Sequence, residues 1–205
     1  MEAHIIEKTI ENLEHNGFTV NYFTNSKDAK AAIMEEIHPK ETIGFGGSVT
    51  VENLGIYESL KEQGNPVYWH WRISEGQNPK ELLKNAANAD IYFSGTNAIT
   101  EEGSLLNIDG TGNRLSGILF GHKRVIIVAG VNKITRNYEE AILRIKNVAC
   151  PANAKRLNRD TPCAKLGKCM NCNSKDRICK ATLIIDRQPA GVPIILFLIN
   201  ESLGF

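Results

Sequence analysis

The stretch from Ile91 to Gly130 reads IYFSGTNAITEEGSLLNIDGTGNRLSGILFGHKRVIIVAG. It contains two short apolar segments next to glycine, Ile91–Ser94 and Val125–Ala129. Such segments are typical of strands that are buried on both faces, as in the parallel sheets of α/β proteins. The polar, glycine-rich residues between them do not suit a sheet core. They are therefore expected to line a cleft where the strands end.

Helical and strand patterns alternate along the rest of the chain. Apolar spacing of three to four predicts helices over residues 2–16, 26–37, 51–63, 79–87, 112–120 and 137–148. Apolar or alternating runs predict strands over residues 18–22, 41–45, 66–71, 91–94, 104–108, 125–129, 180–186 and 193–199. Residues 96–103 are expected to be a loop, and residues 188–191 a hairpin-like connection. The prediction is an α/β fold with a largely parallel sheet and helices on both faces, in one domain over residues 1–205.

The composition describes a soluble globular protein. The chain has 205 residues, of which 42% are hydrophobic and 23% charged, with a net charge of +1. This balance gives no general case for nucleic acid or an anionic membrane as partner. The charged start, MEAHIIEKTIENLEHNG, does not resemble a signal peptide, and the apolar run Val192–Ile199 is too short to cross a bilayer. The cytoplasm is the expected location.

A glycine-rich turn follows the predicted strand at residues 41–45. It contains Gly46, Gly47 and Ser48, with Thr50 just beyond. Backbone N–H groups and hydroxyls in such a turn can bind the phosphate or carboxylate of a substrate. A tight turn with a Ser or Thr helix cap has the same sequence, and no further motif separates the two interpretations.

A second polar segment, Asp109-Gly110-Thr111-Gly112-Asn113, has the flexible backbone found where a main chain approaches a ligand, and also the composition of an ordinary turn. Arg114 follows it and could hold a carboxylate or phosphate in bidentate fashion, or pair with a nearby acid as a structural contact. Lys133 follows the 125–129 strand and is a candidate for binding an anionic group, or an exposed lysine. Together these residues predict a site for a small anionic metabolite.

The five histidines are expected to be structural or exposed. His4, His15, His38 and His122 are predicted at the surface. His70 lies between Trp69 and Trp71 and is predicted to be packed or at an edge, rather than a pocket acid or base.

Four cysteines near the C-terminus, Cys163, Cys169, Cys172 and Cys179, are spaced C-x5-C-x2-C-x6-C. Thiols in a reducing compartment are better metal ligands than disulfide partners, and four of them suit zinc or an iron–sulfur cluster. Residues 155–180 contain eight basic residues and two aspartates, which favours thiolates. A reversible disulfide, or free thiols in a basic nucleic-acid-binding loop, are the alternatives. Residues 150–180 are thus predicted to be a cysteine-rich basic insertion, with Cys150 as a buried or incidental thiol.

Three segments together resemble the LUD (lactate-utilisation) domain family. They are SGTNAITEEGSLLNIDGTGNR, LFGHKRVIIVAGVNKI and the cysteine-rich tail, and the resemblance covers Ile43 to Cys179. It is closest to short, single-domain members with four tail cysteines. The resemblance implies a fold of the NagB/RpiA/CoA-transferase-like group and a role in lactate oxidation. By its motif Ala98-Ile99-Thr100-Glu101, it also implies that Glu101 is the pocket carboxylate, acting as nucleophile or base.

Three functions are compatible with these features. The first is an accessory subunit in the oxidation of lactate to pyruvate, which carries a cysteine-bound metal or iron–sulfur site and works with partner redox subunits. The second is an acyl- or phosphosugar-handling enzyme that uses Glu101. The third is a non-catalytic ligand-binding protein with structural zinc. An exposed sheet edge at Pro193–Ile199 would be compatible with a homodimer.

Overall fold

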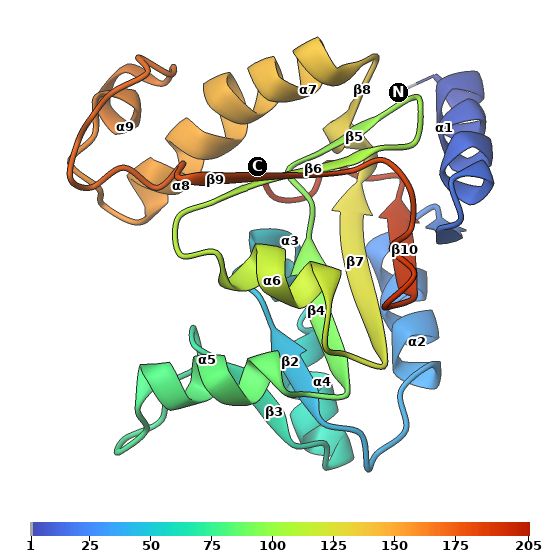
Figure 1. The fold of residues 1–205 in the computed structure, drawn as a ribbon. Coiled ribbons are helices and arrows are strands. Elements are labelled where there is room, and N and C mark those ends of the chain that lie inside the picture. Colours follow the sequence, from blue (N-terminus) through green and yellow to red (C-terminus); the bar gives the residue numbers. More distant parts are fainter. Residues whose placement is uncertain (1) are drawn as a thin grey trace.

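Six parallel strands form the main sheet of the computed structural model, which describes residues 2–205 (Figure 1). Their order is β1-β10-β7-β4-β2-β3, and each neighbouring pair is parallel. The strands span Thr19–Phe23 (β1), Ile43–Phe45 (β2), Val67–Trp69 (β3), Ile91–Gly95 (β4), Arg124–Gly130 (β7) and Ile194–Ile199 (β10). The predicted α/β fold with a largely parallel sheet is confirmed.

Alternate residues of β7 enter two different cores. Val125 and Ile127 pack with α1, α5 and α6, whereas Ile126 and Val128 pack with α2, α3 and α4. All four side chains are fully buried, so both faces of the sheet are covered by helices, as predicted. The helices span Ala3–His15 (α1), Ser26–Glu35 (α2), Val49–Asn53 (α3), Ile56–Gln63 (α4), Pro79–Ala87 (α5) and Asn113–Leu119 (α6).

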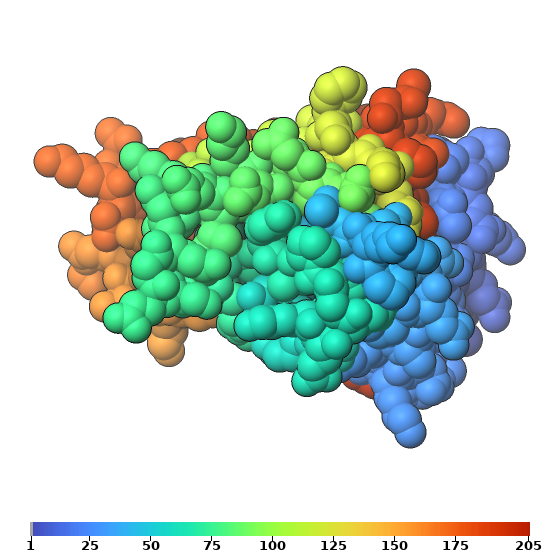
Figure 2. Space-filling model, turned by 90° about the horizontal axis from the view of Figure 1, so that it is seen from below, coloured from blue at the N-terminus to red at the C-terminus, as the bar shows by residue number. Residues whose placement is uncertain are grey.

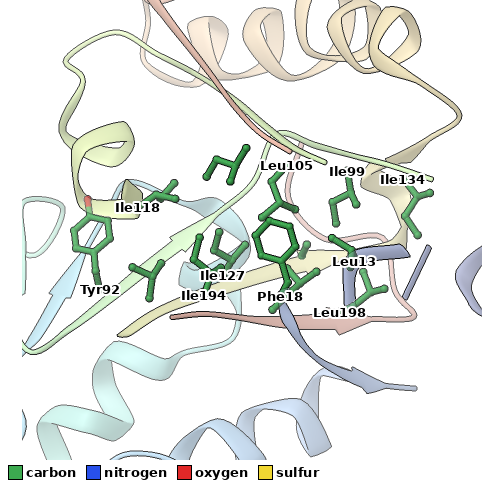
Figure 3. Packing of buried hydrophobic residues seen from close by; sticks show 14 of the residues in the cluster. Leu13, Phe18, Tyr92, Ile99, Leu105, Ile118, Ile127, Ile134, Ile194 and Leu198 are labelled. Carbon is green, nitrogen blue, oxygen red and sulfur yellow. The ribbon is translucent and has the colours of Figure 1, made fainter. Parts of the chain in front are cut away.

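A small second sheet, in the order β8-β5-β6-β9, lies over one face of the main sheet. Its strands span Ala98–Thr100 (β5), Leu105–Asp109 (β6), Ile134–Thr135 (β8) and Ala181–Ile185 (β9). Figure 3 shows Ile99 and Leu105 from this sheet packed above Ile127 and Ile194 from the main sheet. The predicted loop at residues 96–103 is therefore wrong in part, because β5 forms an antiparallel pair with β6.

The last two strands belong to different sheets. β9 pairs antiparallel with β6, whereas β10 lies between β1 and β7 in the main sheet. The predicted hairpin-like connection at residues 188–191 is thus wrong. The exposed edge expected at Pro193–Ile199 is wrong as well, since β10 has a hydrogen-bonded neighbour on each side. This removes the structural argument for a homodimer through that strand.

Two predicted helices have different limits. The 51–63 helix is divided at Gly55, whose φ of +63° separates α3 from α4. The 137–148 helix instead continues through α7 (Tyr138–Arg144) and the π-helix η2 (Ile145–Ala149) into α8 (Cys150–Arg156). The wider π turn shifts the buried stripe. Ala149 is therefore buried, while Val148, expected on the apolar face, is half exposed.

The cysteine-rich region lies at one end of the molecule. In Figure 2 its orange atoms are at the opposite end from the blue N-terminal helices. After α8 it contains one short helix, α9 (Pro162–Leu166), and residues 167–180 form neither helix nor strand. Among residues 2–205, no helix is both long and apolar enough to cross a membrane.

His122 differs from its predicted surface position. It is 6% exposed, its ring stacks on Tyr92, and Nδ1 lies 2.6 Å from the carbonyl oxygen of Ala89. This burial arises from the packing of the turn before β7 against β4 and against Ala89, just before that strand.

Gly44 allows α5 to pack directly on β2. A Cβ atom at this position would overlap the carbonyl oxygen of Ala86 in α5. We expect Gly44→Ala to lower the free energy of unfolding by about 1–3 kcal/mol, because the helix backbone must move away from the sheet. Gly191→Ala is the matched control, since its new Cβ would meet only the exposed ring of Phe120. Urea unfolding of both variants measures the difference, and equal stability would contradict this packing role.

Candidate functional site

A cavity of about 320 Å³ lies at the carboxyl ends of the main-sheet strands. The loops after β2, β3, β4 and β7 line it, together with the end of β6 and the helix α8. β2 and β4 are neighbours, but the chain leaves β2 towards β3 and leaves β4 towards β7. Ligands of open α/β sheets bind at such a reversal of strand order. We call this cavity the cleft.

The cleft contains eight of the ten residues that the sequence predicted to bind substrate. They are Gly47, Ser48, Thr50, Asp109, Gly110, Asn113, Arg114 and Lys133. The other two, Gly46 and Gly112, lie beside it. A Cβ on Gly46 would be 2.8 Å from Cγ of Arg114, and Gly112 precedes α6 with a φ of +91°.

The loop after β2 combines both interpretations made from the sequence. The Ser48 hydroxyl accepts a hydrogen bond from the N–H of Val51 at 3.3 Å, as a helix cap does. The same loop also faces the cleft. It packs tightly there, because a Cβ on Gly47 would lie 2.8 Å from the ring of Trp71 and a Cβ on Gly95 would lie 2.6 Å from the Ser48 hydroxyl.

Lys133 is the most deeply buried charge in the cleft. It is 4% exposed, and Nζ donates a hydrogen bond to the hydroxyl of Thr50 at 2.8 Å. Among residues 2–205 no carboxylate lies within ion-pair distance of it. Burial, with the positive charges of Arg144 and Arg114, lowers the pKa of Lys133 to about 7.

Asp109 organises the turn that forms one side of the cleft. Its carboxylate accepts hydrogen bonds from the N–H groups of Gly110, Gly112 and Arg114 at 3.0–3.2 Å. The Arg114 guanidinium pairs with Asp109 at 3.5 Å and donates to the carbonyl oxygen of Ile108 at 2.7 Å. The structural pairing considered for Arg114 is therefore present, although both side chains also line the cleft.

Several cleft residues were not identified from the sequence. They are His70, Trp71, Thr96, Asn97, Asn153, Arg156, Arg159 and Phe205. Arg156 lies over the ring of Trp71, with Cζ 4.3 Å from the ring centroid. His70, predicted to be packed or at an edge rather than a pocket acid or base, is half-buried and lines the cleft, and burial lowers its pKa.

The cleft is strongly cationic. Its described lining residues include four cationic side chains, Arg114, Lys133, Arg156 and Arg159, and one acidic side chain, Asp109. The only sequence signal for the last two arginines was the basic composition of residues 155–180, which we had related to the cysteines.

Glu101 lies outside the cleft, contrary to the sequence prediction. It follows β5 in the turn to β6, and this turn is directed towards α1. Its carboxylate is 3.3 Å from Nζ of Lys8, and its carbonyl oxygen accepts a hydrogen bond from Asn12 at 2.7 Å. Gly103 closes the turn against Asn12, since a Cβ there would be 2.7 Å from that residue's backbone. The hairpin thus points the carboxylate away from the strand ends.

All five cysteines line a second cavity, of about 210 Å³, which we call the cysteine cavity. None forms a disulfide. The Cys163 thiol lies 3.3 Å from the hydroxyl of Thr161, and the Cys169 thiol accepts a hydrogen bond from the N–H of Asn171 at 3.4 Å. Arg177 donates to the carbonyl oxygens of Cys172 and Cys179, which connects the main chain at these two residues.

The donor set of the cysteine cavity fits a thiolate-bound metal group in its chemistry. Three basic side chains, Lys146, Arg177 and Lys180, also line the cavity and would offset the charge of thiolates. Within residues 2–205, however, no three metal-binding side chains converge on one point.

Cys150, which the sequence predicts to be a buried or incidental thiol, lies between the two cavities. It begins α8 and lines both the cleft and the cysteine cavity. Burial, with the thiols of Cys179, Cys163 and Cys169 nearby, raises the pKa of Cys150 to about 12.

The chain is similar to known proteins along most of its length. The sequence pattern of the LUD domain family matches residues 6–198. No curated protein matches the chain. A DUF162 family protein from Deinococcus radiodurans has a similar structure, with a TM-score of 0.56 and 11% identity over 96% of this chain and 97% of that one. This likeness supports the fold.

Two other solved structures share a smaller part of the chain. Ribose 5-phosphate isomerase from Plasmodium falciparum aligns with 21% identity and a TM-score of 0.35, over 55% of this chain and 52% of that one. The eIF2B beta subunit from Chaetomium thermophilum aligns with 17% identity and a TM-score of 0.39, over 56% and 41%. Because the family pattern covers nearly all of the sequence, this protein belongs to the LUD domain family.

Proposed function

We propose that this LUD domain binds a small anionic metabolite in the cleft and acts as an accessory subunit in lactate utilisation, the oxidation of lactate to pyruvate. Membership of the family supports the process. The observation that carries the binding role is the buried Lys133 ammonium, whose partner within residues 2–205 is a hydroxyl and not a carboxylate.

A buried charge without a counter-ion is costly, so it indicates that a ligand supplies the opposite charge. Lys133 would bind the carboxylate of the metabolite at the inner end of the cleft. The hydroxyl of Thr50, 2.8 Å from Nζ, would help to orient it. Arg156 and Arg159 are exposed at the outer side and would attract the anion from solution.

We also propose that the four tail cysteines bind an iron–sulfur cluster in the cysteine cavity. When bound, such a cluster carries electrons singly, which is the chemistry an accessory redox subunit needs. The hydrogen bonds to the thiols of Cys163 and Cys169 are of the kind that tune cluster potentials. Partner redox subunits would exchange these electrons.

Lys133→Met tests the anion site. It keeps the shape of the side chain and removes the charge, so we expect pyruvate affinity to fall roughly 10- to 150-fold, the value of one charge-assisted hydrogen bond. Isothermal titration calorimetry with pyruvate, L-lactate and inorganic phosphate measures it. Glu101→Gln is the matched control, because it alters a carboxylate outside the cleft and should leave affinity unchanged. Equal binding by Lys133→Met and wild type would disprove the site.

The pH dependence of binding follows from the same lysine. With the pKa of Lys133 at about 7, the free protein loses the ammonium as pH rises above 7. We therefore expect pyruvate affinity to fall by up to tenfold per pH unit between pH 7 and 9, and to stay constant below pH 6. Lys133→Met should show a flat profile over the same range. A flat wild-type profile would mean that Lys133 keeps its charge throughout or does not touch the anion.

Anaerobic reconstitution with iron and sulfide tests the metal proposal. We expect a brown protein with bound iron and sulfide, and loss of both in the Cys169→Ser/Cys172→Ser variant. Cys150→Ala serves as the control, because the four tail thiols remain. Absorbance spectra and metal analysis give the readout. A colourless protein with one zinc ion would contradict the cluster, and a metal-free protein would contradict any metal site.

A further inference from the structure

The cleft and the cysteine cavity share a wall. Cys150 from the start of α8 and Ile108 from β6 line both cavities. The side chains of these two residues belong to one apolar cluster, in which Cys179 also packs. Only one layer of side chains therefore separates an anion in the cleft from a group bound by the thiols.

The main chain connects the two cavities as well. The N–H of Lys180 donates to the carbonyl oxygen of Asp109 at 3.0 Å, so the cysteine-rich tail is fixed to the turn of the cleft. A Cβ on Gly110 would lie 2.8 Å from the carbonyl oxygen of Ile178, so the turn and the tail touch without a side chain between them. Cys179 stands between Ile178 and Lys180, and any change in its position moves this contact.

We propose that anion binding in the cleft and metal binding in the cysteine cavity are energetically coupled, through the wall of Cys150 and Ile108 and through the contact of residues 178–180 with Asp109 and Gly110. This inference rests on the proposed function, which supplies both occupants. It adds that each site responds to the other within one domain.

The coupling is positive. Residues 167–180 form neither helix nor strand, so their order depends on side-chain contacts such as those of Arg177. Ligation of Cys179 would fix the tail and with it the Asp109 turn, so less conformational entropy is lost when the anion binds. Three basic side chains around the thiols limit the repulsion between the metal group and the anion. Coupling must be reciprocal, so the anion also strengthens metal binding.

Calorimetry on the full chain tests this directly. We expect the Kd for pyruvate to be at least about fivefold lower in the reconstituted protein than in the metal-free protein. As the reciprocal measurement, saturating pyruvate should slow the loss of metal to a chelator. Cys150→Ala should keep its metal, but the ratio between the Kd for pyruvate of its metal-free form and that of its loaded form should fall towards one, because the wall has lost its packing.

The outcomes separate this inference from the proposed function. Equal Kd values in metal-free and loaded wild type would overturn the coupling while leaving both sites in place. If neither the metal-free nor the loaded protein binds pyruvate, the anion site is wrong. If the reconstituted protein holds no metal, the cluster is wrong. The coupling would be wrong in both cases. Loss of metal in Cys150→Ala would indicate that Cys150 is a metal ligand, and would overturn its proposed role in the wall between the two cavities. Ile108→Val removes one methyl group from the same wall and is a second, milder variant. An unchanged ratio between the pyruvate Kd values of its metal-free and loaded forms would also count against the coupling.

Discussion

The burial of β7 on both faces is the constraint on which the rest of the structure depends. Its side chains alternate between two apolar cores, and each core is closed by a separate layer of helices. A strand in this position cannot carry a polar group in its interior without a costly desolvation. Charged side chains are therefore restricted to the ends of the strands, and parallel pairing brings the carboxyl ends together at one edge. The cleft is the result of this restriction.

Hydrogen bonds from side chains to the main chain then shape the cleft. Arg144 donates to the carbonyl oxygens of Asn132 and Asn97, at 3.1 and 2.7 Å, and so joins the segments after β7 and β4. Asp109 holds its own turn through three N–H groups. These contacts restrict the backbone that carries the lining groups, and ligation of the tail cysteines would restrict the Asp109 turn further, which lowers the cost of binding.

Electrostatics divides the functional residues into two classes. Arg114 is paired with Asp109 and mainly supports the turn, whereas Lys133 has a hydroxyl and, in the described part of the chain, no carboxylate beside it. The cysteine cavity is arranged in a similar way, since Arg177 binds main-chain carbonyl oxygens and leaves the thiols available. The contact between the cysteine-rich tail and the Asp109 turn places the cleft and the cysteine cavity side by side.

The sequence by itself determined the parallel α/β fold, the family and most of the cleft. Buried strands have a local signature, and residues directly after such strands must lie near the sheet edge. It did not determine the direction of Glu101, the strand order around β10 or the position of Cys150. These depend on long-range packing: Glu101 is turned away by the β5–β6 hairpin against α1, β10 is inserted between distant strands, and Cys150 packs in a cluster with Ile108 of β6. None of these contacts has a local signal, since each joins residues that are far apart in the chain.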